Sequence, residues 1–247
     1  MTLSFKCRRG SCVAMSLFQY MFIFFSLVSC TSHNSSIPIR GIFHPWDRAL
    51  CLIREPVASK EIYDLPIDAR EGVYVSQGPL NPGDHRSHGY ANCMYAVDFA
   101  HYQEDSRFIL ASRAGRVIGI YEGCSHQNCN HGCGDGFGNW VALLHDEDEV
   151  SFYAHLEQIS VHIGQALSKG ERIGIEGNTG NAGARHLHFS LYRLNGADPF
   201  SVFPYLLQPI PYRLRYYGKG KQPRIVDIRI FRGIDTDKRE YLYGKRE

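Results

Sequence analysis

The sequence lacks a strong charge of either sign, an internal repeat and a low-complexity tract. Its 27 Lys and Arg residues nearly balance its 25 Asp and Glu residues, so the formal net charge is only +2. This balance gives no overall case for nucleic-acid binding. With 44% hydrophobic and 21% charged residues, the composition excludes a wholly disordered or collagen-like chain. The 247 residues suffice for one large domain, or for a medium-sized domain with extensions.

The N-terminal region lacks an apolar run of membrane-spanning length. Its apolar run, Leu17–Val28, has 12 residues, whereas a membrane helix needs about 20. Three positive residues precede it, namely Lys6, Arg8 and Arg9. A positive start followed by a short apolar run is typical of a secretory signal, so we interpret residues 1–30 as an export signal.

The end of this signal resembles the lipobox of bacterial lipoproteins. The segment Leu27-Val28-Ser29-Cys30 is followed by a polar stretch, and the resemblance implies a lipid acceptor at Cys30. A plain secretory signal cut nearby and an uncleaved anchor are the alternatives. All three interpretations export the chain, and we expect a membrane-anchored lipoprotein that faces the periplasm or the cell surface.

The expected export of the chain decides how its cysteines are interpreted. Five of the eight cysteines follow Cys30, at positions 51, 93, 124, 129 and 133. Oxidising compartments favour disulfides. The dense segment from Cys124 to Cys133 also holds His126 and His131, but no distant second pair completes a structural zinc site. We therefore favour a disulfide inside 124–133, with Cys51–Cys93 as a plausible second bridge, although the sequence leaves the connectivity open.

Short β-type runs separated by turn residues dominate the chain from Val73 onwards. The runs expected as strands are Val73–Ser76, Tyr95–Phe99, Phe108–Ala111, Arg116–Tyr121, Trp140–Leu144, Val150–His155, Arg172–Glu176, His186–Tyr192 and Ile225–Phe231. This spacing predicts a mainly β, antiparallel domain. We expect a lead-in segment over residues 31–72, the main domain over 73–200 and an extension over 201–247.

The extension is basic. From Arg213 to the end, 11 Lys and Arg residues face 5 Asp and Glu residues, a net +6 that leaves −4 for the rest of the chain. Attraction to an anionic wall polymer or membrane surface is one interpretation. A solvated strand pair with charged outward faces is the other.

The chain contains no His-Glu-x-x-His segment, so the common helical zinc-peptidase arrangement is absent. Histidines gather instead around three expected strands, at His88 upstream of Asp98, at His155, and at His186 with His188. Residues two apart in a strand share a face, roughly 7 Å from one another. Two His and one Asp meet the three-ligand count of catalytic zinc, which leaves a fourth position for water. We interpret His44, His101, His145 and His162 as ordinary core or surface residues.

Between about Ser76 and Tyr192 these segments, in this order, resemble the lysostaphin/LytM-type zinc endopeptidases, which cut peptide cross-links of bacterial peptidoglycan. The segments that carry the resemblance are Ser87-His88 with Tyr95–Phe99, Ala111–Val117, Gly138-Asn139-Trp140-Val141, Tyr153-Ala154-His155-Leu156, Ser168–Gly174 and His186-Leu187-His188-Phe189. The resemblance implies an antiparallel sheet domain of the duplicated hybrid motif type, with a groove on one face.

Carried over by position, the resemblance implies that His88, Asp98 and His188 bind Zn²⁺ and that His155 and His186 are catalytic. One departure concerns the spacing. Many members separate the first His and the Asp by four residues, whereas His88 and Asp98 are ten apart. His85 is a rival for the first ligand, and Ser-His-Gly makes His88 the nearer match.

The activity expected from this set is hydrolysis of peptidoglycan cross-links. Zinc activates a water and polarises the scissile carbonyl. One histidine would take the proton and the other would stabilise the oxyanion. The alternatives are a regulator of other wall hydrolases, which in this family has typically lost ligands or catalytic histidines, and a secreted protease acting on Gly-rich proteins. Expected partners are the cross-links and, through Cys30, the membrane. No nucleic-acid partner is expected.

Overall fold

The computed structural model describes residues 56–79, 88, 93–102, 105–125, 133–196, 207–218, 222–231 and 241–244. All of these residues belong to the compact unit formed by residues 37–247. The helical elements that the structure describes in full are three 3₁₀ turns, η4 (Cys133–Gly136), η5 (Asp146–Asp148) and η6 (Ile228–Ile230). Within those ranges, the chain forms no apolar helix long enough to cross a membrane.

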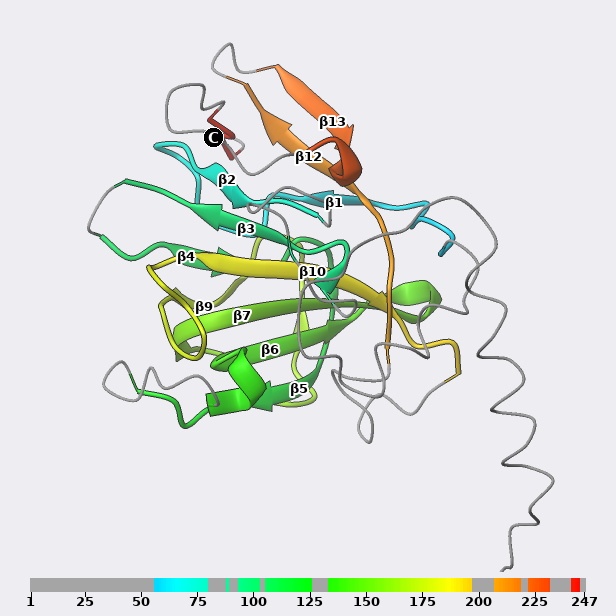
Figure 1. The fold of residues 1–247 in the computed structure, drawn as a ribbon. Helices are drawn as coiled ribbons and strands as arrows, with labels where there is room; N and C mark the ends of the chain where they lie inside the picture. Colours follow the sequence, from blue (N-terminus) through cyan, green and yellow to red (C-terminus); the bar gives the residue numbers. More distant parts are fainter. Residues whose placement is uncertain are drawn as a thin grey trace, which may run out of the picture. The chain divides into compact units, whose positions relative to one another are not determined.

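A ten-stranded sheet is the centre of the fold (Figure 1). Its main path has the order β2-β3-β10-β7-β6-β5-β8, while β9 pairs with β7 and β4, and β11 pairs with β10. Its strands are β2 (Tyr74–Gln77), β3 (Val97–Ala100), β4 (Phe108–Leu110), β5 (Gly115–Tyr121), β6 (Asn139–Leu144), β7 (Glu149–Ile159), β8 (Ala166–Leu167), β9 (Arg172–Glu176), β10 (Leu187–Arg193) and β11 (Gln208–Pro209). All pairings in this sheet are antiparallel.

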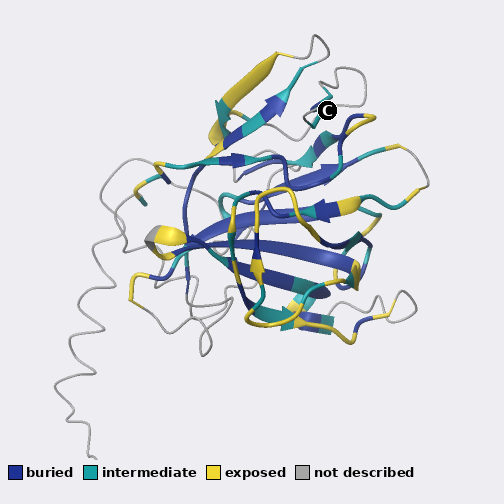
Figure 2. Cartoon of the chain, turned by 180° about the vertical axis from the view of Figure 1, so that it is seen from behind, coloured by how far each residue is buried: buried dark blue, intermediate teal, exposed yellow. Residues whose placement is uncertain are grey.

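A three-stranded sheet covers one face of the larger sheet. It has the order β1-β12-β13, built from β1 (Ile62–Asp64), β12 (Arg213–Tyr217) and β13 (Pro223–Asp227). Strand β12 alternates exposed Arg213 and half-buried Arg215 with buried Leu214 and Tyr216. Those buried side chains belong to the same apolar core as Tyr153 and Phe189 of the large sheet. Figure 2 shows the central strands buried, whereas β13 is exposed over its first three residues and half-buried over its last two.

Strand β10 separates the two faces of the large sheet. Its side chains alternate, so Leu187, Phe189 and Leu191 enter the core beneath the three-stranded sheet. His188 and Tyr192 point to the opposite face, where a second apolar cluster contains Tyr192, Phe152 and Phe137. The period of two therefore gives one face of β10 to the main core and places His188 on the other face, beside the second apolar cluster.

The mainly β, antiparallel fold is confirmed, with one parallel pair, β1 with β12. A strand is found at each expected run, but the prediction for Ile225–Phe231 is wrong in its second half. Strand β13 ends at Asp227, whose carboxylate accepts a hydrogen bond from the Arg229 backbone N–H and caps η6. Strands β1 and β12 come from the segments expected as lead-in and extension.

One disulfide prediction is confirmed. Cys124 and Cys133 are bonded, with a Cα–Cα distance of 5.9 Å, and close the insertion between β5 and β6. Cys51 and Cys129 lie outside the described residues, so the Cys51–Cys93 pair stays a prediction.

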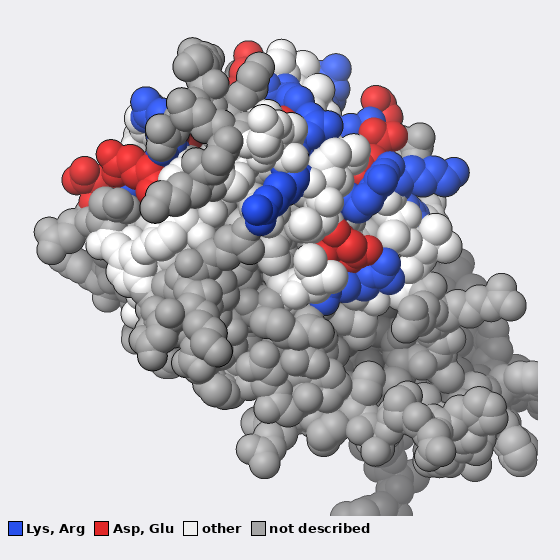
Figure 3. Space-filling model, turned by 90° about the horizontal axis from the view of Figure 1, so that it is seen from above, with Lys and Arg blue, Asp and Glu red and all other residues white. Residues whose placement is uncertain are grey.

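The described part of the basic extension lies close to carboxylates. Arg229 pairs with Asp227, and Arg215 lies 3.2 Å from Asp64. Lys169, from the main domain, lies 2.8 Å from the other oxygen of Asp64. Figure 3, seen from the side of β12 and β13, shows the two signs of charge interspersed. Attraction to an anionic surface stays a prediction.

Candidate metal centre and flanking histidines

The register of three strands brings Asp98 and His188 together. His188 in β10 lies directly opposite Asp98 in β3 and opposite Ala154 in β7. Directly opposed residues in antiparallel strands have neighbouring Cβ atoms on the same face. His188 Nδ1 consequently lies 3.0 Å from Asp98 Oδ1. Pairing of β3 with β10, which are distant in sequence, thus brings together two of the three residues of the cluster.

His88 joins the cluster from the segment that follows β2. Its backbone N–H and its ring Nδ1 both contact the carbonyl oxygen of Gly78, at 3.1 and 2.9 Å. A carbonyl oxygen only accepts, so Nδ1 carries the hydrogen. Nε2 is then left with a lone pair that points toward Asp98 and His188.

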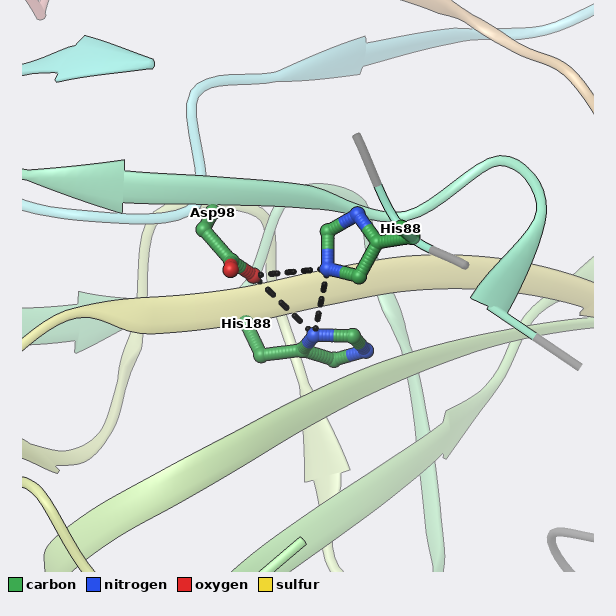
Figure 4. Close-up of side chains that lie close together, drawn as sticks. All are labelled: His88, Asp98 and His188. Atoms are coloured by element: carbon green, nitrogen blue, oxygen red, sulfur yellow. Dashed lines mark hydrogen bonds and ion pairs between the residues drawn. The ribbon is translucent and has the colours of Figure 1, made fainter. Parts of the chain in front are cut away.

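The three side chains meet in one compact cluster (Figure 4). His88 Nε2 is 3.2 Å from Asp98 Oδ1 and 3.2 Å from His188 Nδ1. All three residues are buried. Ligand atoms placed about 2.0–2.1 Å from a tetrahedral zinc lie about 3.3 Å from one another. The observed separations match that spacing, and the donor set of two imidazoles and one carboxylate suits zinc.

The electrostatics of the cluster favour a bound cation. Burial alone would raise the pKa of Asp98, but His88 and His186 hold it well below its usual range. Burial would lower the pKa of His88, yet the Asp98 carboxylate raises it. Burial lowers the pKa of His188, and burial together with neighbouring imidazoles holds the pKa of His155 well below the usual value. A metal ion binds carboxylate and neutral imidazole, so an ionised Asp98 and a neutral His188 suit it.

His155 lies at an irregularity in β7. Before it, β7 pairs with β6 and β10, and after it β7 pairs with β9 and, at Leu156, with Asn139 of β6. Its φ of +64° is left-handed, a conformation uncommon outside glycine. Irregularities of this kind re-aim a side chain. Here the His155 ring lies 5.8 Å from the His188 ring and 4.6 Å from the His186 ring, measured between centroids.

Backbone carbonyls orient both flanking histidines. His155 Nδ1 donates to the Thr179 carbonyl at 2.7 Å, and His186 Nδ1 donates to the Ala184 carbonyl at 2.9 Å. The Nε2 atom of each ring is therefore left to accept a proton. His186 Nε2 lies 3.6 Å from Asp98 Oδ2, and its side chain, 14% exposed, is the most open of the five.

All five residues proposed from the sequence lie in one place. His85, the rival for the first ligand, lies outside the described residues. Sequence reasoning gave no role to Thr179 or to Asn139, although Asn139 lies in one of the segments that carry the resemblance. Thr179 orients the His155 ring through its backbone carbonyl. Every residue has such a carbonyl, so the residue type gives no signal of this role. Asn139 is buried in a hydrogen-bond network beside His155, and a lone Asn after a Gly was the only available signal.

A protein-family model matches the region that carries four of these five residues. The model of Peptidase family M23 matches residues 93–199. These residues form a peptidase family M23 domain. The match includes Asp98, His155, His186 and His188, and it begins after His88.

Curated relatives match parts of the chain. "Peptidoglycan DD-endopeptidase ShyA" of Vibrio cholerae serotype O1 is 44% identical over 54 residues, which cover 22% of this chain and 13% of that protein. "Uncharacterized lipoprotein YgeR" of Escherichia coli is 37% identical over 97 residues, 39% of this chain and 34% of that protein. "Murein hydrolase activator NlpD" of Escherichia coli is 31% identical over 97 residues, 39% of this chain and 23% of that protein. The chain thus spans about a third or less of these relatives' lengths.

A solved structure, a zinc containing peptidase from Vibrio cholerae, also matches. The match covers 57% of this chain and 40% of that chain, with 21% identity and a TM-score of 0.41.

Proposed function

We propose that the M23 domain is a zinc-dependent endopeptidase that hydrolyses peptide bonds in peptidoglycan cross-links. One observation carries the proposal: three metal-ligand atoms lie within 3.2 Å of one another beside two histidines whose Nδ1 atoms donate to backbone carbonyls. A relative described as a peptidoglycan endopeptidase, matched at 44% identity, supports the substrate class.

His88, Asp98 and His188 would hold the metal. The Gly78 carbonyl fixes the His88 ring so that Nε2 faces the site, in the way that outer partners orient metal-binding histidines. Zinc bound there supplies Lewis-acid polarisation of a carbonyl and lowers the pKa of a coordinated water.

His155 and His186 would handle the protons. The ring of each donates through Nδ1 to a backbone carbonyl and keeps Nε2 available. Burial keeps the His155 ring neutral by lowering its pKa, and a neutral ring can take a proton from water and pass it to the leaving amine. His186, the more open ring beside Asp98, is placed to contact the substrate carbonyl as charge develops on its oxygen.

A second candidate function is activation of other wall hydrolases without catalysis. The observation in its favour is the 31% identity to a murein hydrolase activator. The complete set of His88, Asp98, His155, His186 and His188 favours the enzyme, because a purely regulatory surface does not require these five groups.

Zymography on purified peptidoglycan tests the proposal. We expect clearing that a chelator abolishes and added zinc restores. Clearing that appears only when a second wall hydrolase is supplied would favour the activator. Clearing confined to Gly-rich protein substrates would identify a secreted protease instead.

We further propose that the chain is exported and anchored through a lipid on Cys30. Its relative YgeR is described as a lipoprotein. Metabolic labelling with a palmitate analogue should mark the wild type and leave Cys30→Ser unlabelled. Labelling that persists in Cys30→Ser would contradict this assignment.

A further inference from the structure

The Cys124–Cys133 disulfide is connected through Asn139 to the strand that carries His155. The bond joins two residues that are nine apart in sequence. Both lie between β5 and β6, and β6 begins at Asn139. Asn139 is 2% exposed, so its polar groups must find partners within the protein.

All four hydrogen-bonding positions of the Asn139 side chain are used. Its Oδ1 accepts from the backbone N–H groups of Gly123, at 3.0 Å, and Cys124, at 2.9 Å. Its Nδ2 donates to the carbonyl oxygens of Cys124, at 2.9 Å, and Leu156, at 3.0 Å. An Asn amide offers two acceptor and two donor positions. One side chain therefore links the disulfide to the residue after His155.

The backbone of Asn139 reaches the other support of His155. Its N–H donates to Thr179 Oγ1 at 2.9 Å, and that hydroxyl donates to the Leu156 carbonyl at 2.9 Å. The Thr179 carbonyl accepts the His155 Nδ1 hydrogen at 2.7 Å. Asn139 thus contacts the residue whose carbonyl orients the His155 ring and also the peptide that follows His155.

The two loops around this network touch without intervening side chains. A Cβ on Gly138, whose φ is +65°, would lie 2.4 Å from the Thr179 carbonyl carbon and oxygen. Asn181 also donates its backbone N–H to the Gly136 carbonyl at 2.7 Å. Because the two backbones are in van der Waals contact, a shift of the segment before Asn139 would displace Thr179.

We propose that the Cys124–Cys133 disulfide acts through Asn139 to position His155 for catalysis. Asn139 is a positioning residue, because its contacts are with backbone groups and Thr179. The inference rests on the proposed function, since it assumes that His155 is catalytic. Outer partners of metal-site groups typically contribute 10–100-fold to activity, which sets the expected size of the effect.

The test compares Asn139→Ala and the isosteric Asn139→Asp with wild type, each zinc-loaded and ¹⁵N-histidine-labelled. We expect kcat on a soluble cross-linked peptide to fall about 10–100-fold, with a smaller change in KM and unchanged zinc content. Long-range ¹H–¹⁵N spectra should show His155 as the Nδ1–H tautomer in wild type and as a tautomer mixture in both variants. Asn139→Asp keeps the acceptor half of the network and remains informative if Asn139→Ala fails to fold.

Tyr63→Phe is the matched control, because Tyr63 is fully buried and hydrogen-bonded to Glu149 in the core on the far face. It should lower the melting temperature while leaving kcat and the His155 tautomer unchanged. If the Asn139 variants behave like this control, the proposal is overturned.

Removing the disulfide tests the route through Asn139. In a Cys129→Ser background, Cys124→Ser with Cys133→Ser should lower kcat in the same direction but by less than Asn139→Ala. Combined with Asn139→Ala, the cysteine changes should add less than about twofold, because both act on one pathway. Effects that multiply would contradict the proposal. If wild type cuts no cross-link, the proposed function fails while the tautomer spectra still decide the positioning.

Discussion

The two faces of strand β10 are stabilised by different kinds of interaction. On one face, Leu187, Phe189 and Leu191 are fully buried among aromatic and aliphatic side chains. On the other, His188 and, just before the strand, His186 face Asp98 and His155, and hydrogen bonds with particular distances define the arrangement. Apolar packing tolerates exchange of similar volumes, whereas a hydrogen-bonded site does not.

This difference suggests that stability and chemistry can be separated by single substitutions along one strand. Substitutions on the face that carries His188 should abolish zinc binding or catalysis and leave the fold intact. Changes on the core face should lower stability and leave the metal-binding geometry of the folded molecules intact.

The largest effect is expected for His188→Ala. It removes one of the three proposed ligands, so zinc per chain should fall from about one to near zero, with cleavage at background. Metal analysis of the purified protein measures this, and His162→Ala, an exposed histidine outside the site, is the control. Full zinc content in His188→Ala would rule out its role as a ligand.

His155→Ala and His186→Ala should each retain stoichiometric zinc. Loss of a positioned proton-transfer group lowers rates about 10²–10⁴-fold. Cleavage of a soluble cross-linked peptide, assayed beside metal content, measures both properties. Loss of zinc in either variant would show that the residue is a ligand instead.

Phe189→Ala, next along the strand, should act on stability. Its ring is fully buried and packs edge-on against Tyr153 and Tyr212. Truncation of such a ring costs about 3–5 kcal/mol, which urea denaturation would reveal. The folded fraction should bind zinc normally. A variant of wild-type stability with lost zinc would contradict the division between the two faces.

A smaller effect is expected for His145, whose ring packs edge-on against the buried Tyr63 ring. Burial lowers the pKa of His145 to about 4, whereas an unfolded histidine titrates near 6.5. Below pH 6.5 the His145 imidazole is protonated in the unfolded chain but stays neutral in the folded chain. The free energy of unfolding therefore falls as the pH falls toward 4.

The expected loss is about 3 kcal/mol over that window. Urea denaturation at pH 7.5 and 4.5 would measure it, with His145→Gln as the comparison, because the variant lacks the titrating group. An equal acid loss in wild type and variant would show that His145 is not responsible.

The sequence predicted the parts of the fold that follow from local pattern. Alternation identified β10 and placed His186 and His188 on one face. Strand β1 has three residues within a proline-rich stretch, too few for any period to show. The end of β13 depends on the Asp227 side chain, which competes with the sheet by capping the next turn. The opposition of Asp98 and His188 arises from strand pairing, which no local pattern encodes.

The most direct test of the central claim is mass spectrometry of peptidoglycan incubated with the wild type, the chelated protein and the protein with zinc restored. We predict new free amino and carboxyl termini within cross-link peptides in the first and third samples and none in the second. Intact cross-links in all three samples, from a protein that binds zinc at His88, Asp98 and His188, would contradict it.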